Sequence, residues 1–413
     1  MEKIMIYIIV VYSVYLFTKK RTYFDFLSLM FFSTLFYFLP FIFGFVTIKE
    51  NNIVKYISIN SKTYNIAIIL FLSILLVTFL YDKYIKQKIK QRNYYILMDK
   101  GFYKFCICLF CVISIWFYIT QGRFMIGKVR DLSNMVGIYK IWSNMILILG
   151  GVSIVSRSKL GVLISILGAS FDLYLGDRTI FVILIITLVS YTLIEKCSKG
   201  LIYYKKMIVV ILLIILPLIV YKKLIGPIQR GDIYELVNRI TTMETYTNSI
   251  VSIEPFTTQC ILNEVVSKNY KVKENTLVAV YNLIPLMEKY KYTTFNEQMQ
   301  EVLFSSIEYG MGSNVWAEMY SNLSIIGVYI MILIYVFIGV AASFLFEKVD
   351  GDILKAIMLI SFSLFIFYIH RNSIVYQINL NFRVIYLYIG VVCLYIISKK
   401  IIVLNNIIQS NRK

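Results

Sequence analysis

Charged residues and histidine are scarce in this chain of 413 residues. Only 16% of the residues are charged, a single histidine is present, and 59% of the residues are hydrophobic. The mean hydropathy is +0.73. A soluble domain could not hide that much apolar surface from water. The composition excludes a soluble protein and predicts a polytopic integral membrane protein.

Cysteine is also rare, and several catalytic motifs are missing. Of the six cysteines, Cys106, Cys108 and Cys111 lie within one apolar run with no histidine or carboxylate nearby, so we interpret them as ordinary helix residues. There is no phosphate-binding Walker loop, no H-E-x-x-H and no G-x-S-x-G. We expect neither a metal nor a cofactor.

Acidic residues are outnumbered, at 23 against 42 lysines and arginines, which gives a net charge of +19. The basic residues form short strips between apolar runs. That distribution is typical of signals that orient membrane helices, and it argues against a nucleic-acid partner.

Long apolar runs recur along the whole chain. Each is continuously apolar rather than alternating, which predicts helices and excludes barrel strands. We therefore predict an all-α fold with about eleven transmembrane helices. The ninth is unusually long and is expected to start as an interfacial helix before it turns into the membrane. The expected helices occupy residues 4–17, 24–47, 64–81, 102–120, 138–155, 160–176, 179–194, 207–221, 315–346, 353–369 and 382–398.

The predicted helices divide the chain into three parts. Residues 1–221 hold eight helices, residues 222–314 form one large external loop, and residues 315–413 hold three helices. The loop is too polar to span, but it contains short amphipathic stretches at Tyr234–Val251 and Phe295–Ile307. We expect it to be partly helical and to pack over the membrane domain.

The basic strips predict one orientation. We place the lysine-rich connector 82–101 in the cytoplasm, and counting helices in both directions then puts the other main strips on the same side. The N-terminus is expected outside and the C-terminus inside. The strips that agree are Lys19–Arg21, Arg157 with Lys159, Lys196–Lys206, Lys348, and Lys399 with Lys400.

Arginines gather on the predicted outer side, against the usual tendency of basic residues to stay inside. The planar guanidinium offers paired donors that suit phosphate, so we expect an anionic ligand that is itself membrane-bound, such as a lipid pyrophosphate. Headgroup contacts or local pairs, such as Arg130 with Asp131 and Arg230 with Asp232, are the alternatives. The set comprises Arg123, Arg130, Arg178, Arg230, Arg239, Arg371 and Arg383.

Three positions carry the candidate chemistry. Arg178 lies between two apolar runs with almost no loop, and an ionisable group at membrane depth indicates function or a pairing with Asp177. Glu318 begins the ninth helix, where it is either a general base or sugar ligand, or a carboxylate favoured by the helix dipole. His370 precedes Arg371 and is either a base or a satisfied interfacial residue.

Three stretches resemble the Wzy-type polymerases of O-antigen or oligosaccharide repeat units. They are L-G-D-R-T at 175–179, G-S-N-V-W-A-E-M-Y-S-N-L-S-I-I-G-V-Y-I at 312–330, and Arg371 closing a late helix. The second is the most specific, although Leu323-Ser324 stands where that family has Phe-Gly. The helix count and the single large outer loop are similar across nearly the full length.

The resemblance implies a GT-C-like glycosyltransferase in the bacterial inner membrane, with its active face outside. Such an enzyme moves a growing glycan from undecaprenyl pyrophosphate onto a lipid-linked repeat unit, building O-antigen or capsule-type polysaccharide. Arg178 and Arg371 would be the main pyrophosphate contacts, with Arg123, Arg230 and Arg239 as accessories. A chain-length regulator would be a partner. An O-antigen ligase and a lipid-linked oligosaccharide flippase are the alternatives.

Overall fold

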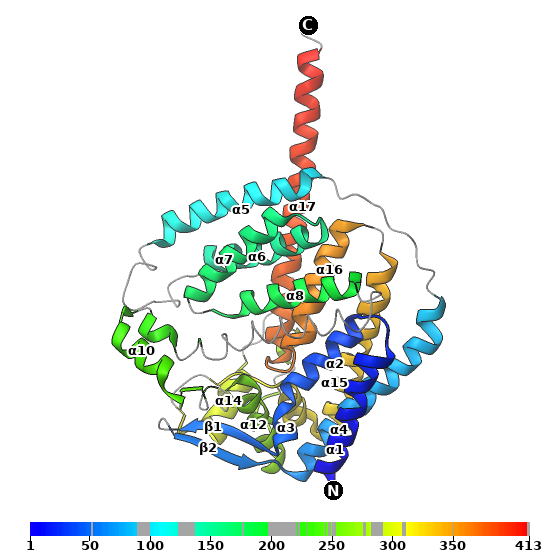
Figure 1. Cartoon of the computed structure of the whole chain (residues 1–413), viewed down its shortest axis with the longest axis vertical. Coiled ribbons are helices and arrows are strands. Elements are labelled where there is room, and N and C mark those ends of the chain that lie inside the picture. The colour runs from blue at the N-terminus through cyan, green and yellow to red at the C-terminus, as the bar shows by residue number, and fades with distance from the viewer. Residues whose placement is uncertain are drawn as a thin grey trace. The chain divides into compact units, whose positions relative to one another are not determined.

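The computed structural model consists mainly of helices, which confirms the predicted helical membrane fold in outline (Figure 1). Two compact units divide the chain: residues 1–91, 192–348 and 362–379 form the first, and residues 92–191, 349–361 and 380–413 the second. The structure describes residues 1–50, 53–88, 100–122, 137–175, 177–196, 221, 224–228, 230–243, 245–246, 249, 253–275, 278–281, 292–307, 311–349 and 351–410.

The first unit contains the N-terminal helices, a small hairpin and the helices of the polar segment. Its elements are α1 (Glu2–Tyr15), the π-helical turn η1 (Leu16–Lys20), α2 (Phe26–Tyr37), α3 (Leu39–Phe43), β1 (Phe45–Glu50), β2 (Ile53–Ser58), α4 (Ser61–Leu80), the turns η2 (Tyr81–Ile85) and η3 (Lys86–Lys88), α10 (Ile233–Thr241), α12 (Glu254–Ser267), α13 (Val278–Tyr281), α14 (Phe295–Leu303) and α15 (Val315–Lys348).

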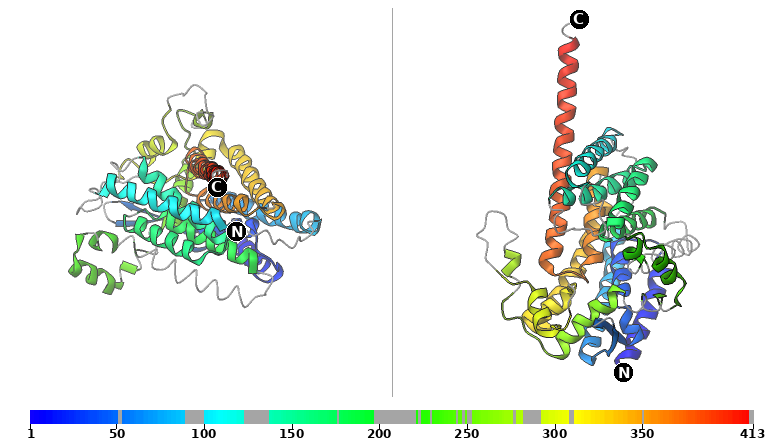
Figure 2. Two further views of the ribbon diagram at one scale, coloured as in Figure 1. Left: turned by 90° about the horizontal axis from the view of Figure 1, so that it is seen from above. Right: turned by 90° about the vertical axis from the view of Figure 1, so that its left-hand side faces the viewer.

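The second unit is built on α5, α6 and α7, which pack in sequence against one another (Figure 2). Close approach depends on Gly150 and Gly151, because a Cβ there would meet Leu184 at 2.2 Å and Ile360 at 2.4 Å. Three further helices, α8, α16 and α17, run through both units. The bounds are α5 (Lys100–Gln121), α6 (Ile138–Val155), α7 (Lys159–Leu175), α8 (Thr179–Lys196), α16 (Asp352–Tyr368) and α17 (Ile374–Ser410).

Five of the described helices are long and apolar enough to cross a membrane. Each contains one of the spans predicted at 64–81, 102–120, 138–155, 315–346 and 382–398. Residues 207–220, which hold nearly all of another predicted span, lie outside the described residues. The five helices are Ser61–Ile85, Gly101–Gln121, Ile138–Val155, Val315–Lys348 and Ile374–Ile401.

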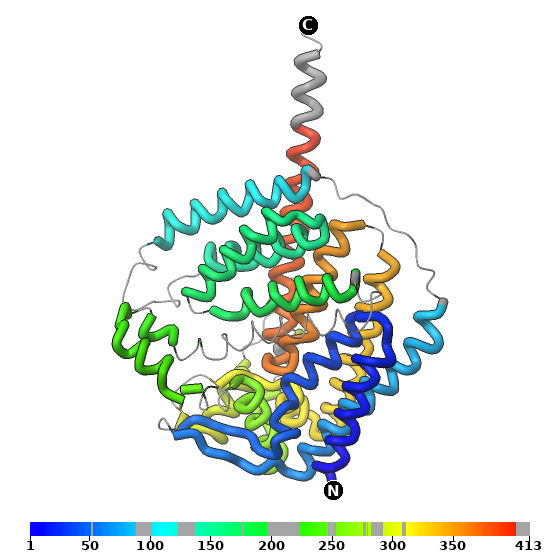
Figure 3. Tube along the Cα trace, viewed as in Figure 1, coloured from blue at the N-terminus to red at the C-terminus, as the bar shows by residue number. Residues whose placement is uncertain are grey.

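The span predicted at 24–47 is wrong as a single helix. Helix α2 ends at Tyr37, α3 restarts with Pro40 in its first turn, and Gly44 leaves the helix with a φ of 86°. Proline is tolerated only in a first turn and glycine adopts positive φ without strain, so these two residues divide the run. The chain then enters the antiparallel hairpin β1–β2, which the sequence analysis missed (Figure 3).

Helix α12 joins the predicted external loop to the helical unit. It packs against β1 and also contacts α2, α3, α4 and α15. Its Phe256 ring lies 5.4 Å from the ring of Phe45 on the hairpin, and the Asn263 side chain accepts the backbone N–H of Asn60 at 2.8 Å. Ten of its fourteen residues are buried, so this part of the loop belongs to the core of the first unit.

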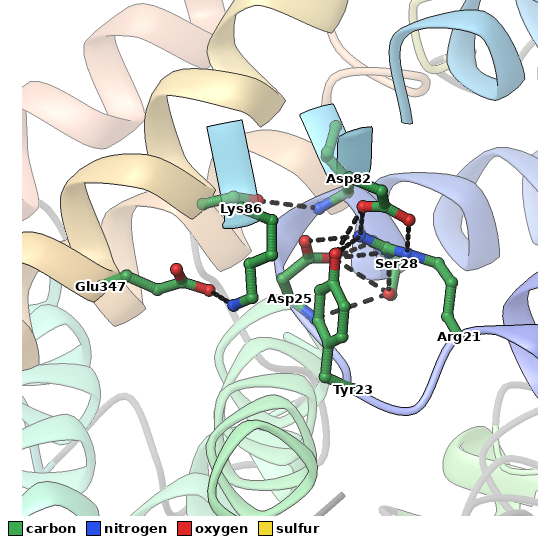
Figure 4. A network of polar contacts seen from close by, with 9 residues as sticks. Arg21, Tyr23, Asp25, Ser28, Asp82, Lys86 and Glu347 are labelled. Carbon is green, nitrogen blue, oxygen red and sulfur yellow. Dashed lines mark hydrogen bonds and ion pairs between the residues drawn. The ribbon is translucent and has the colours of Figure 1, made fainter. Parts of the chain in front are cut away.

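A cluster of charged residues joins the C-terminal ends of α1, α4 and α15 (Figure 4). Arg21 donates to both carboxylate oxygens of Asp25, at 2.9 Å each, and to both of Asp82, at 2.9 and 2.8 Å. Lys86 pairs with Glu347 at the end of α15. Arg21 of the first basic strip and Asp82 and Lys86 of the connector 82–101, two strips predicted to share one side of the membrane, therefore lie together. Glu347 directly precedes Lys348, a residue predicted to lie on the same side.

The other ends of two of these helices also meet. The Ser61 hydroxyl, at the start of α4, donates to Glu2, at the start of α1, at 2.7 Å. Contacts at both ends show that α1 and α4 run in the same direction. In the predicted orientation, the first and third spans also cross the membrane in the same direction.

Helix α15 is two helices joined at Ser324, whose φ of 59° and ψ of −151° are not helical. The Lys271 ammonium donates to the Tyr320 carbonyl at 2.9 Å and to the Ser324 hydroxyl at 2.5 Å, and so stabilises the end of the first helix. A Cβ at Gly327 would lie 2.3 Å from the Met319 carbonyl oxygen, which only glycine avoids. The break agrees with the predicted change of direction early in this span.

Substitutions at Ser324 should show the strain of this break. A non-glycine residue in this region of φ and ψ costs about 1–3 kcal/mol, and a β-branched residue costs most. Serine already carries this cost, so Ser324→Val should lower the free energy of unfolding further, whereas Ser324→Gly relieves a strain of about 1–3 kcal/mol and should not lower it. Thermal unfolding in detergent measures both, and a valine variant as stable as wild type would contradict the prediction.

Candidate functional site

The turn between α16 and α17 holds Arg371 at the centre of the candidate site. The backbone N–H of Ser313 donates to the Arg371 carbonyl at 3.0 Å, which ties the turn to the segment before α15. The Arg371 Nε forms an ion pair of 2.5 Å with the Glu254 carboxylate at the start of α12. Three segments that are distant in sequence thus converge on one guanidinium.

The two terminal amino groups of Arg371 are available to a ligand. Among the residues that the structure describes, none accepts a hydrogen bond from either group, and the side chain is 32% exposed. Burial disfavours the charged form, but the Glu254 carboxylate together with nearby tyrosines outweighs this effect and raises the pKa of Arg371. A charged fork of this kind, fixed at Nε, suits a phosphate group.

Glu318 lies beside this turn in a supporting position. Its side chain is buried, and Oε2 accepts the backbone N–H of Ile374, the first residue of α17, at 2.8 Å. A carboxylate at a helix N-terminus satisfies a free N–H and is stabilised by the dipole. This geometry favours the second of the two interpretations of Glu318, a structural carboxylate.

The segment before α15 is shaped by Asn314. Its side-chain oxygen accepts the backbone N–H groups of Trp316 and Ala317 at 2.9 and 3.1 Å, and its amide donates to the Thr258 carbonyl on α12 at 3.0 Å. Asparagine is a favoured residue just before a helix for this reason. One side chain thus starts α15 and fastens it to α12.

His370 is fully buried and both of its ring nitrogens are engaged. The Trp316 indole can only donate, so Nδ1 accepts from it at 3.1 Å and the neutral ring carries its proton on Nε2. Nε2 lies 3.0 Å from the Tyr335 hydroxyl. Burial lowers the pKa of His370 to about 3, so the ring is neutral at physiological pH. These contacts favour the satisfied residue over the base.

The structure brings together three of the predicted site residues and adds others. Glu318 comes from one stretch and the consecutive residues His370 and Arg371 from another, and they meet in the first unit. Glu254 and Asn314 were not predicted. Asn314 could have been found as a helix cap preceding an apolar run, but nothing in the sequence links Glu254 to Arg371.

Arg178 lies in the second unit, between α7 and α8. The Asp177 carboxylate accepts the Thr179 backbone N–H at 2.9 Å and so starts α8. Among the described residues, the Arg178 side chain forms no ion pair, so the alternative of a pairing with Asp177 is not seen. Gly176 lies outside the described residues.

The other predicted arginines have different surroundings. Arg230 and Arg239 both pair with Glu235, while Asp232 caps α10 instead of pairing with Arg230. Arg383 is exposed on the part of α17 that belongs to the second unit. The last two of the set, Arg123 and Arg130, lie outside the described residues.

Within the described ranges, no group of three or more histidine, cysteine, aspartate or glutamate side chains could hold a metal ion. No protein-family model, curated protein or solved structure matches this chain. The function therefore has to be argued from the residues of this chain and their geometry.

Proposed function

We propose that the chain is a polysaccharide polymerase that uses lipid-pyrophosphate donors, with about eleven membrane helices in a GT-C-like arrangement. It would extend O-antigen or capsule-type glycan on the outer face of the bacterial inner membrane. The observation that carries the proposal is the Arg371 guanidinium, which is anchored through Nε by Glu254 and whose two terminal amino groups have no acceptor among the described residues. The L-G-D-R-T and G-S-N-V-W-A-E stretches support the same function.

The chemistry requires a positive group where the donor leaves. The bond between the anomeric carbon and the pyrophosphate oxygen breaks, and the acceptor hydroxyl oxygen bonds to that carbon and loses its proton. A fixed guanidinium stabilises the negative charge that develops on the departing pyrophosphate. We assign this role to Arg371, with Arg178 as a second contact. Arg123, Arg130, Arg230, Arg239 and Arg383 are proposed accessories.

The assignments of Glu318 and His370 change with their contacts. A general base needs a free acceptor atom within reach of the acceptor hydroxyl. The only acceptor nitrogen of neutral His370 is taken by Trp316, and Glu318 holds the start of α17. We propose that both residues position the turn that carries Arg371, and that the proton leaves through another group.

A deletion strain separates the three candidate functions. Loss of a polymerase leaves single repeat units attached to the lipid A core, because flipping and ligation continue. Loss of a ligase or a flippase leaves none. We expect single units by electrophoresis of the glycan, and a return of the long ladder when the wild-type chain is supplied. Core without any repeat unit would contradict the polymerase.

Topology mapping tests whether the two main arginines can share a pocket. Reporter fusions or labelling after residues 178 and 371 should place both on the outer side. If the two positions lie on opposite sides of the membrane, no common pyrophosphate pocket exists and the proposal fails. A chain-length regulator is the expected protein partner of the working enzyme.

A further inference from the structure

Helix α10 has an apolar face that none of the described residues of the first unit covers. None of its residues is buried. Ile233, Val237 and Ile240 follow one another at helical spacing and are 73%, 53% and 43% exposed. Tyr234 borders this face, and Met243 extends it just beyond the helix. An exposed apolar stripe of this kind is typical of a surface that contacts lipid or another molecule.

The opposite face of α10 is charged, and its charged side chains form a helix cap and ion pairs. Asp232 caps the helix by accepting the Glu235 backbone N–H at 2.9 Å. The Glu235 carboxylate pairs with Arg230 and with Arg239, and both arginines keep part of their surface exposed. The two faces therefore differ sharply, with ion pairs on one side and aliphatic groups on the other.

The size of the face argues against a protein partner. A helix of nine residues is about 14 Å long. One face of it covers far less than the 1,200–2,000 Å² or so that a stable protein–protein interface buries. A lipid surface has no such minimum, because each apolar side chain gains separately from leaving water.

The position of α10 in the chain also favours lipid. The sequence predicts that a membrane span ends at residue 221, and α10 begins at Ile233, so the intervening chain reaches about 40 Å at most. Tyr234 has the amphipathic ring that is enriched at membrane interfaces. Arg230 and Arg239 are placed to reach lipid phosphates from the polar side, as long basic side chains do.

We propose that α10 is an interfacial helix, with its apolar face in the outer leaflet of the bilayer and its ion-paired face toward water. It anchors the polar segment 222–314 to the membrane surface. This inference depends on the chain being a membrane protein and is independent of the polymerase activity.

The full-length protein in liposomes of phosphatidylethanolamine and phosphatidylglycerol provides the test. A spin label is placed at Val237→Cys on the apolar face or at Asn238→Cys on the polar face, in a chain whose native cysteines are replaced. We expect the label at 237 to collide mainly with oxygen dissolved in lipid, and the label at 238 mainly with a water-soluble nickel complex. Exposure of both labels to water, or shielding of 237 from both reagents as in a protein contact, would overturn the proposal.

A second measurement keeps the native cysteines. Val237→Asp and Asn238→Asp add the same charge to opposite faces of α10. We expect Val237→Asp to speed tryptic cleavage at Arg230 and Arg239 several-fold in liposomes that expose this face, and Asn238→Asp to leave the rate unchanged. Equal cleavage rates in the two variants would overturn the proposal even if the cysteine-free chain failed to fold.

Discussion

Arg371→Ala is expected to stop polymer growth while leaving the protein in the membrane. The substitution removes the guanidinium whose terminal amino groups are proposed to hold the departing pyrophosphate. Loss of one pre-placed donor to a developing negative charge typically lowers the turnover rate by about 10²–10³-fold. Glycan ladders from a deletion strain carrying the variant, with membrane levels checked by immunoblot, measure the effect. Full-length glycan would contradict the assignment.

Matched variants separate charge, geometry and anchoring at this position. Arg371→Lys keeps the charge but loses the planar fork, so we expect short ladders. Glu254→Gln keeps the shape of the carboxylate but removes its charge and so weakens the anchor on Nε, and should shorten ladders less than Arg371→Ala. Arg178→Ala should stop growth if both arginines bind the pyrophosphate. Lys62→Ala, which removes an exposed basic residue at the start of α4, should leave the ladder unchanged.

Arg21→Ala is expected to cause the largest loss of stability in the chain. The Arg21 side chain is 2% exposed and donates four hydrogen bonds to two carboxylates, one of which, Asp25, also caps α2 through Ser28. Removing one partner of a buried ion pair costs about 3–5 kcal/mol, because the remaining charge is left uncompensated. The unfolding temperature of the variant, measured in detergent, should therefore be lower than that of the wild type.

Two controls test this explanation of the Arg21 cluster. Lys20→Ala removes a neighbouring but exposed charge and should change stability little. Asp82→Asn should cost less than Asp25→Asn, because the Asp82 side chain is 31% exposed and Asp25 only 4%. An Arg21→Ala variant that unfolds at the wild-type temperature would show that the cluster contributes little.

The features that could be predicted from the sequence are those marked by patterns that extend over many residues. The apolar runs located the five long helices, and the unusual length of the ninth run predicted a change of direction, which the structure has at Ser324. The basic strips predicted that the ends of the first, third and ninth spans share one side of the membrane; in the structure, Arg21 contacts Asp82 and Lys86 pairs with Glu347. Each of these signals extends over many residues, so single substitutions do not obscure it. The division at 221 and 314 stays a prediction.

Other features depend on contacts between distant residues and had no local pattern. Strand β1 begins inside the apolar run 24–47, where only a proline and a glycine separate it from α2. The state of His370 is set by Trp316 and Tyr335, more than thirty residues away in sequence. The sequence predicted this histidine as a candidate base, whereas its contacts favour a buried, neutral residue that positions the turn of Arg371.

Composition was enough to establish that this chain is a helical membrane protein, because burial in lipid requires long apolar helices whatever their neighbours are. Folding in three dimensions was needed to bring Glu254 to Arg371, Glu318 to Ile374 and Arg21 to Asp82. Ion pairs and caps form wherever two groups come within about 3 Å of each other, and that proximity is a property of packing rather than of spacing along the chain.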